Sequence, residues 1–342
     1  MEDIIRNKKV IDKIAHASKF ENSSIERVLW MTQISKEIYK SEFLKNDFAL
    51  MGGSAIAFLY GNIYRLSVDI DLDYINNHDL GKYDRNEITD LQSRHMSEFE
   101  KIAHRLKLEY QPVNQEDNRF LQLTMSYKSI YGQQKTIELD LGYRYCHTVL
   151  GTKKAVWPNI FEIENYKSLP VMTLMPEELW ASKITAMIGT NRIDIKGKRY
   201  LGSKNKIRHL YDTWHLIDSE EIMNEINIGI LKSLTILFGM TRVENYDLCR
   251  GDALALYSQA DYDNDLYPVI RNTKDLPQLR IMQRDTRKFL DEFIFSYDEN
   301  EYEFMEDFKS GNFRPLKILP PKIAKKVEGL YFYKEMLEIV KR

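Results

Sequence analysis

Residues 48–74, FALMGGSAIAFLYGNIYRLSVDIDLDY, contain the pattern that decides the fold and the chemistry. From residue 65 onward polar and apolar residues alternate, which is the period of a β-strand with one buried face. The polar face of this strand carries Arg65, Ser67, Asp69, Asp71 and Asp73. Carboxylates that share a strand face raise each other's pKa unless a cation lies between them. The pattern therefore predicts a divalent metal site, and the alternative is an acidic strand that faces solvent.

A short apolar strand, a glycine turn and a helix precede the acidic strand. Residues 48–51 are apolar, Gly52 and Gly53 predict a tight turn, and Ser54 is placed near the N-cap of a helix over residues 55–60. Glycine lets the backbone approach a ligand, and a helix N-terminus offers N–H groups to phosphate. The turn is suited to a polyphosphate and the acidic strand to Mg²⁺, the combination that nucleotidyl transfer requires.

The composition is that of an ordinary globular chain. With 342 residues and 43% hydrophobic residues, the chain is long enough for two domains and a sizeable core. The net charge of −2 excludes a global attraction to nucleic acid or membrane, so any such attraction must be local. Cys146 and Cys249 have no paired spacing, which argues against a disulfide framework or a zinc site. No apolar run approaches a membrane span and the N-terminus is charged, so we expect a cytoplasmic protein without a membrane partner.

The rest of the chain supplies helices and a hairpin. Residues 1–45 predict helices, with Ser23 and Glu26 in the spacing of a capping box, and residues 88–106 predict another helix. Residues 120–127 and 136–145 predict a β-hairpin. Residues 151–170 contain prolines and predict the passage between domains, after which residues 220–342 are mostly helical.

The motif Gly53-Ser54 followed by Arg65-x-Ser67-x-Asp69-x-Asp71 resembles the nucleotidyltransferase toxins of the AbiEii/AbiGii group. This group is a branch of the DNA polymerase β-like superfamily with a minimal nucleotidyltransferase fold, so the resemblance implies an α/β (α+β) domain with a mixed sheet. By resemblance, Asp69 and Asp71 hold Mg²⁺ or Mn²⁺, and NTP is bound by Gly53, Ser54, Arg65 and Ser67. The spacing from Ser54 to Asp69 is slightly longer than the common pattern, which indicates a longer helix or loop.

A third carboxylate is expected from a neighbouring strand, because polymerase-β-like enzymes take one there. Residues 136–141 alternate and place Glu138 and Asp140 on one face, so either can supply it, and we prefer Asp140. The alternative is a half-exposed strand with acidic outer residues.

Two further residues are implied by resemblance. Pro176 opens a helix in which Lys183 falls among apolar positions, and Pro-Glu-Glu-Leu followed by Ala-x-Lys183 resembles the motif whose lysine contacts the NTP. Residues 208–215 resemble the basic-Asp-x-x-Asp element of the family, with Asp212 at the second aspartate and His209 in place of the first. We expect Asp212 to orient Lys183 from an adjacent helix, and the role of His209 stays open.

The stretch at residues 196–208 carries six basic residues and no acidic one. It can attract an RNA backbone locally, or it can be a solvated connection between helices.

We predict a helical segment at residues 1–45, a nucleotidyltransferase domain at 46–165 and a helical domain at 166–342. The predicted function is metal-dependent nucleotide transfer from an NTP to an RNA acceptor such as tRNA, by the toxin of a type IV toxin–antitoxin or abortive-infection system used in phage defence. Its partners would be that RNA and a cognate antitoxin such as a winged-helix AbiEi-like protein. The alternatives are a nucleotidyltransferase that modifies protein hydroxyls and a catalytically idle module that binds nucleotide or antitoxin.

Overall fold

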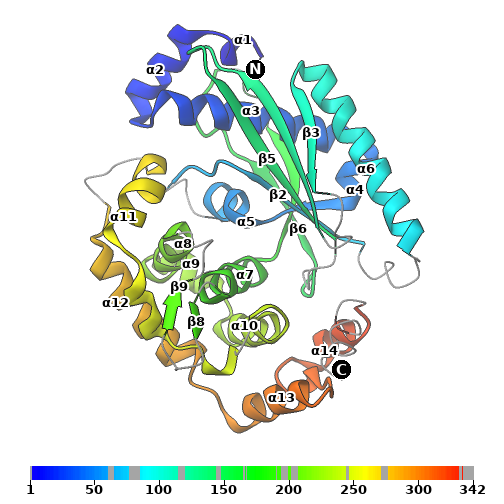
Figure 1. The fold of residues 1–342 in the computed structure, drawn as a ribbon, viewed down its shortest axis with the longest axis vertical. Coiled ribbons are helices and arrows are strands. Elements are labelled where there is room, and N and C mark those ends of the chain that lie inside the picture. The colour runs from blue at the N-terminus through cyan, green and yellow to red at the C-terminus, as the bar shows by residue number, and fades with distance from the viewer. Residues whose placement is uncertain are drawn as a thin grey trace. The chain divides into compact units, whose positions relative to one another are not determined.

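The structure is a computed structural model (Figure 1) that describes residues 2–60, 65–76, 85–114, 120–143, 148–164, 166, 168–189, 191–193, 199–201, 207–243, 246–270, 276–330 and 333. The chain divides into two compact units. The first unit comprises Met1–His147, Gly151–Leu174 and Val269–Thr273, and the second comprises Thr148–Leu150, Met175–Pro268 and Lys274–Arg342. The domain boundaries near residues 45 and 165 stay predictions.

One mixed sheet forms the centre of the first unit, in the strand order β3-β4-β5-β2-β1-β7-β6. Its strands are β1 (Phe48–Leu50), β2 (Ile70–Tyr74), β3 (Glu109–Asn114), β4 (Phe120–Lys128), β5 (Gln134–Gly142), β6 (Thr152–Trp157) and β7 (Leu169–Leu174). The acidic strand β2 lies inside the sheet, antiparallel to β1 and parallel to β5. This arrangement confirms the predicted mixed α/β fold.

The helices of the first unit pack mainly on one face of this sheet. They are α1 (Glu2–Ile5), α2 (Lys8–Ser18), α3 (Asn22–Lys40), α4 (Glu42–Asp47), α5 (Gly52–Ser54), the π-helix η1 (Ala55–Tyr60) and α6 (Arg85–Leu106). Trp30 of α3 lies 5.4 Å from Tyr127 of β4 between ring centroids, and Phe99 of α6 lies 6.1 Å from Phe48 of β1. The face of β4 that carries Tyr127 is therefore buried, and its polar residues point to the other face.

The strands β6 and β7 were not predicted. Residues 151–170 were expected to link domains, but they contribute to a hairpin in which β7 pairs in parallel with β1 through Leu50 and Thr173. The hydroxyl of Thr173 also donates to the backbone oxygen of Leu50 at 3.1 Å. Because β6 is an edge strand, it tolerates exposed lysines and a nearby proline that hide it in the sequence.

The capping box predicted at Ser23 and Glu26 is wrong. The N-cap of α3 is Glu21, and the buried carboxylate of Glu26 instead accepts hydrogen bonds from the hydroxyl of Ser129 at 2.5 Å and the amide of Ile130 at 3.0 Å. Glu26 thus fastens α3 to the turn between β4 and β5, a contact that sequence spacing cannot reveal.

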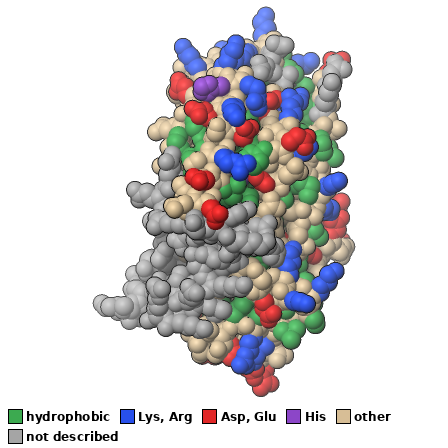
Figure 2. All heavy atoms as spheres, turned by 90° about the vertical axis from the view of Figure 1, so that its right-hand side faces the viewer, with side chains coloured by type: hydrophobic (Ala, Val, Ile, Leu, Met, Phe, Trp, Pro, Cys, Tyr) green, Lys and Arg blue, Asp and Glu red, His purple; other side chains and the backbone are tan. Residues whose placement is uncertain are grey.

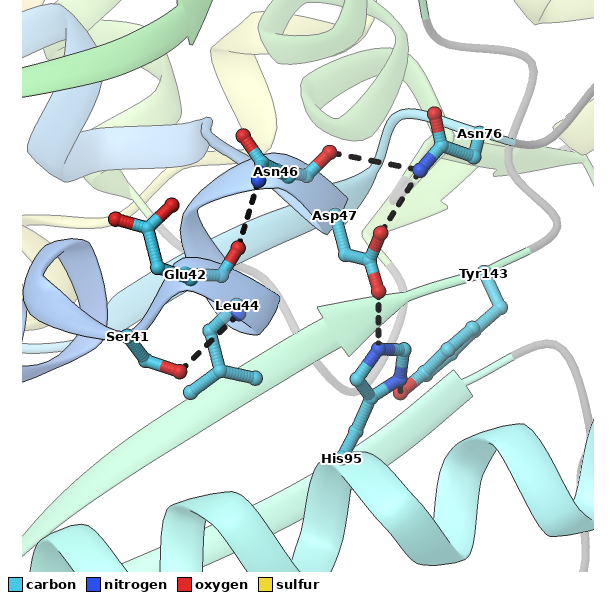
Figure 3. A network of polar contacts seen from close by, with 8 residues as sticks. All are labelled: Ser41, Glu42, Leu44, Asn46, Asp47, Asn76, His95 and Tyr143. Atoms are coloured by element: carbon cyan, nitrogen blue, oxygen red, sulfur yellow. Dashed lines mark hydrogen bonds and ion pairs between the residues drawn. The ribbon is translucent and has the colours of Figure 1, made fainter.

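A buried polar network joins α4 to α6 (Figure 3). The ring of His95 is buried, with Nε2 2.8 Å from Asp47 Oδ2 and Nδ1 2.8 Å from the hydroxyl oxygen of Tyr143. The side-chain amide of Asn76 donates to Asp47 at 2.9 Å. Burial lowers the pKa of His95, although the hydrogen bond and the charge of Asp47 act in the opposite direction. The folded protein therefore favours the neutral imidazole.

The second unit is largely helical. Its main helices are α7 (Pro176–Gly189), α8 (Ile207–Asp218), α9 (Glu220–Glu225), α10 (Ile228–Arg242), α12 (Leu279–Phe289), α13 (Glu299–Lys309) and α14 (Pro321–Glu328). Shorter turns are η3 (Tyr246–Leu248), η4 (Gly251–Leu256), α11 (Gln259–Asp261), η5 (Tyr262–Leu266), η6 (Tyr267–Val269), η7 (Leu290–Ile294) and η8 (Pro315–Lys317), and the strands β8 (Asn191–Ile193) and β9 (Arg199–Leu201) pair. No helix in the described ranges is long and apolar enough to cross a membrane.

Candidate active site

Three half-buried carboxylates, Asp69, Asp71 and Asp140, form an acidic set in the first unit. Asp71 of β2 and Asp140 of β5 are register partners on parallel strands, so their side chains project from the same face. Asp69 directly precedes β2 and lies two residues from Asp71, and its charge acts on Asp140. The structure thus places Asp71 beside Asp140, with Asp69 nearby.

The electrostatics of Asp140 reflect these neighbours. Burial and then the charge of Asp71 raise the pKa of Asp140 to about 6, against a hydrogen bond from Gln122, and Asp69 and Glu138 add to the rise. The side-chain amide of Gln122 donates to Asp140 Oδ1 at 2.9 Å. Glu138 is exposed and pairs with Thr124 of β4. Of the two acids proposed from the sequence, Asp140 is therefore the neighbour of Asp71.

The glycine turn packs directly against Asp71. Gly52 has φ +64°, and a Cβ there would lie 1.8 Å from Asp71 Oδ2, so only glycine fits. The amide of Gly53 donates to the same oxygen at 3.2 Å. The turn therefore holds the carboxylate of Asp71 in place.

Ser54 differs from its predicted position near the helix N-cap. The helical turn begins at Gly52, Met51 is its N-cap, and the buried hydroxyl of Ser54 donates to the backbone oxygen of Asp69 at 2.7 Å. Ser54 thereby fixes the chain just before β2. Its contact with NTP stays a prediction.

Arg65 and Ser67 lie beneath the glycine turn. Arg65 is 2% exposed and donates through Nη1 to the backbone oxygen of Leu66 at 2.9 Å. A Cβ on Gly53 would meet Arg65 Nη2 at 2.9 Å and Ser67 Oγ at 3.1 Å. Arg65 forms a β-bridge with Ile270, and the amide of Leu66 donates to the oxygen of Val269 at 2.8 Å. Both side chains therefore pack against the glycine turn. Their role in NTP binding stays a prediction.

Asp73, the third aspartate on the polar face of the acidic strand, is buried at 1% exposure between Ala49 and Gly142 in register. It therefore lies deeper in the sheet than Asp69 and Asp71.

Lys183 and Asp212 form a buried ion pair in the second unit. Lys183 Nζ on α7 lies 3.0 Å from Asp212 Oδ2 on α8, and the two side chains are 7% and 0% exposed. The helices α7 and α8 pack together, so Asp212 lies beside Lys183 on an adjacent helix, as the family motif implied. His209 is half-buried on α8. Of the basic stretch at 196–208, only residues 199–201 and 207–208 fall within the described residues.

Comparison with known proteins decides the family. Residues 38–309 match a family model described as nucleotidyl transferase AbiEii toxin, type IV TA system. The chain belongs to the AbiEii family. It is thus a nucleotidyltransferase toxin of a type IV toxin–antitoxin system, which implies a cognate antitoxin.

The structure of this AbiEii protein is similar to that of MenT4, a nucleotidyltransferase toxin from Mycobacterium tuberculosis H37Rv. The TM-score is 0.57 over 97% of this chain and 99% of that chain, at 13% sequence identity. At this identity the similarity shows a shared fold. A search of the curated proteins found no match.

Nucleotidyltransferases such as the AbiEii toxins generally use an NTP and a divalent metal ion. In the described part of the chain, no three His, Cys, Asp or Glu side chains already converge as a metal site. The acidic set nevertheless fits Mg²⁺ or Mn²⁺, because carboxylates are hard oxygen donors and a cation would relieve the repulsion that raises the pKa of Asp140. The donors fit the ion, but they are not gathered around one point.

A cation missed by sequence reasoning stands beside the acidic set of this AbiEii toxin. Arg27 of α3 donates through Nη2 to the backbone oxygen of Thr136 at 2.7 Å, and the same atom lies 4.0 Å from Asp69 Oδ1. Arg27 precedes the matched range, so the family motifs do not include it. The available signal was an arginine between the buried positions Glu26 and Val28, where a charge needs a partner.

Proposed function

We propose that this toxin transfers a nucleotide from an NTP to an RNA acceptor, of which tRNA is the expected class, in a Mg²⁺-dependent reaction in the cytoplasm. The observation that carries the proposal is the register of Asp71 with Asp140 beside a glycine turn that contacts Asp71. A solvent-facing acidic strand would need neither a glycine turn packed against it nor a second acidic strand in register.

Asp69, Asp71 and Asp140 would hold the ion. When bound, Mg²⁺ or Mn²⁺ would neutralise phosphate charge and orient the NTP. Arg27 partly neutralises Asp69 before loading, because its guanidinium lies 4.0 Å from that carboxylate.

The phosphates of the NTP would be held by the backbone at Gly53, by the hydroxyls of Ser54 and Ser67, and by Lys183. Arg65 would act indirectly, by packing against the glycine turn that contacts the phosphates. Lys183 is pre-oriented because Asp212 fixes its ammonium at 3.0 Å. Charge-assisted contacts of this type are about twice as strong as neutral hydrogen bonds.

The reaction forms a bond between the acceptor hydroxyl oxygen and the α-phosphorus and breaks the bond to the β-phosphate, so that pyrophosphate leaves. The hydroxyl proton would pass to Asp140. Asp140 suits this role because its carboxylate lies beside Asp71 in register, where the reacting hydroxyl is expected.

The proposal is tested by incubating the purified protein with each labelled NTP, Mg²⁺ and total RNA. A labelled RNA band identifies donor and acceptor together, label on protein would assign the acceptor to protein hydroxyls, and no label on either would favour an idle binding module. Asp140→Asn should abolish transfer and the matched variant Glu138→Gln should keep it, because Glu138 is exposed on the same strand. An active Asp140→Asn together with an inactive Glu138→Gln would reverse the assignment.

The cognate antitoxin is proposed to be a winged-helix AbiEi-like protein. A neighbouring reading frame for such a protein, whose co-expression restores growth, would support this. Rescue by an unrelated protein from the same operon would refute it.

A further inference from the structure

Four exposed lysines form a cationic surface at one end of the sheet: Lys8, Lys9 and Lys13 of α2 and Lys128 at the end of β4. Residues 4–20 contain five lysines and arginines and one acid, Asp12, in a chain whose net charge is −2. The helix α2, which carries three of these lysines, lies outside the matched range 38–309.

The helix α2 is fastened to the turn between β4 and β5. The Tyr131 hydroxyl donates to Asp12 Oδ1 at 2.7 Å, the amide of Asn22 donates to the Tyr131 hydroxyl at 2.9 Å, and Lys8 Nζ lies 5.4 Å from the Tyr131 ring centroid. Figure 1 shows α1 and α2 together at one end of the first unit. These bonds hold the carboxylate of Asp12 toward the turn. Lys9 and Lys13 lie one helical turn apart on α2, so their side chains are neighbours.

A polar strip connects this surface to the acidic set. Along β4 and β5 the register pairs Gln122 with Asp140, Thr124 with Glu138, Ser126 with Thr136, and Lys128 with Gln134. All these residues belong to the sheet face opposite the buried one, since the residues that alternate with them are buried. Six residues at about 3.3 Å each separate Asp140 from Gln134, a span of about 20 Å. A stacked RNA strand covers that span with about six nucleotides at roughly 3.4 Å each.

We infer that the cationic surface binds the sugar–phosphate backbone of the acceptor RNA, about six nucleotides from the end that reacts at Asp140. This inference rests on the proposed function, because it assumes an RNA acceptor. The exposed Glu138 repels phosphate in the middle of the strip, and the exposed Glu109, which accepts a hydrogen bond from Gln134 at 3.0 Å, repels it beside β3. The phosphate contacts therefore fall at the lysines of α2. The strip favours RNA over an acidic protein, because it leads from the lysines to the reacting end.

The test compares the wild type with a triple variant, Lys8→Gln, Lys9→Gln and Lys13→Gln, on 5′-fluorescein single-stranded RNAs of three and ten nucleotides. The ten-nucleotide RNA should bind the wild type more tightly than the three-nucleotide RNA. The variant should lose about 10²-fold in affinity for the longer RNA at 0.15 M salt and flatten the log–log salt dependence by about 2 to 3. Its binding of the shorter RNA, which cannot reach the lysines, should not change.

The matched control removes the same charge from the same unit: Lys40→Gln, Lys101→Gln and Lys107→Gln, all exposed positions on or next to α3 and α6. On the face in Figure 2 that carries α6, acidic and basic side chains are interspersed, so no cationic surface is lost there. The control should bind both RNAs like the wild type.

Equal affinity of the variant and the wild type for the ten-nucleotide RNA would overturn the inference and assign the surface to an acidic protein partner. The three-nucleotide RNA distinguishes failure of the inference from failure of the proposed function, because it can react without reaching the lysines. If both proteins extend the short RNA with labelled NTP, the proposed function stands whatever the lysines do. If the wild type labels neither these RNAs nor total RNA, the proposed function fails, and the inference fails with it.

Discussion

Replacing Gly52 by alanine should separate the position of Asp71 from the stability of the fold. Gly52 has φ +64°, and a left-handed conformation costs an alanine about 1–2 kcal/mol. The new Cβ would also lie 1.8 Å from Asp71 Oδ2, so this carboxylate must move by about 2 Å to reach an ordinary contact. A displacement of about 1 Å at a catalytic group lowers the rate by about 10²-fold.

Gly132→Ala is the matched control for this experiment. Gly132 has φ +90° in the turn between β4 and β5, and a Cβ there meets nothing within 4 Å. Gly132→Ala should therefore lose about 1–2 kcal/mol of unfolding free energy, measured by urea denaturation, and Gly52→Ala should lose more, because its Cβ would also lie 2.8 Å from Asp71 Cβ. Only Gly52→Ala should lose nucleotide transfer in a single-turnover assay and weaken Mn²⁺ binding measured by electron paramagnetic resonance. Equal transfer and equal Mn²⁺ affinity in the two variants would refute the claim that the turn positions Asp71.

Three further predictions concern charged groups. Asp69→Asn and Asp71→Asn should each abolish transfer without lowering thermal stability, because each removes one anion from a repulsive cluster, and transfer at the wild-type rate would disprove their role. Lys183→Met should remove the cation 3.0 Å from the buried carboxylate of Asp212 and cost about 3–5 kcal/mol in urea. Lys183→Met with Asp212→Leu should recover stability but not transfer, and an active double variant would make the pair purely structural. His95 should make stability depend on pH, because its pKa is lowered in the fold. Its contribution to the free energy of unfolding is present above the unfolded pKa of 6.5 and is lost as the pH falls through the folded pKa. His95→Gln should therefore show a smaller change in urea midpoint between pH 8 and pH 5 than the wild type.

Local patterns in the sequence were sufficient for the second half of the acidic strand, the hairpin of β4 and β5, and the helix that carries Lys183. In each, the period of burial is set within one element, so alternation or helical spacing is visible without knowledge of the partner. The prediction of a strand was wrong for residues 65–69, which lie before β2 and contribute only an isolated bridge at Arg65. The proximity of Lys183 and Asp212 followed from a family motif and not from periodicity.

The features that sequence reasoning missed all depend on contacts between distant residues. Strand β7 is recognisable only through its pairing with β1, more than a hundred residues earlier, and Arg27 becomes a site residue only because β5 brings Thr136 beside Asp69. Glu26 satisfied the capping spacing, but hydrogen bonds to a turn about a hundred residues away prevailed over the local pattern.

The return of the chain to the first unit delays completion of the toxin during its synthesis. Arg65 and Leu66 make backbone contacts with Ile270 and Val269, so the segment beside the acidic strand lacks these partners until residue 270 has been made. After Leu174 the ribosome must add about 100 more residues, which takes about 5–20 s at 5–20 residues per second. During that interval the nascent toxin is present without its finished site, so the chain is inactive for several seconds after its sheet has been synthesised.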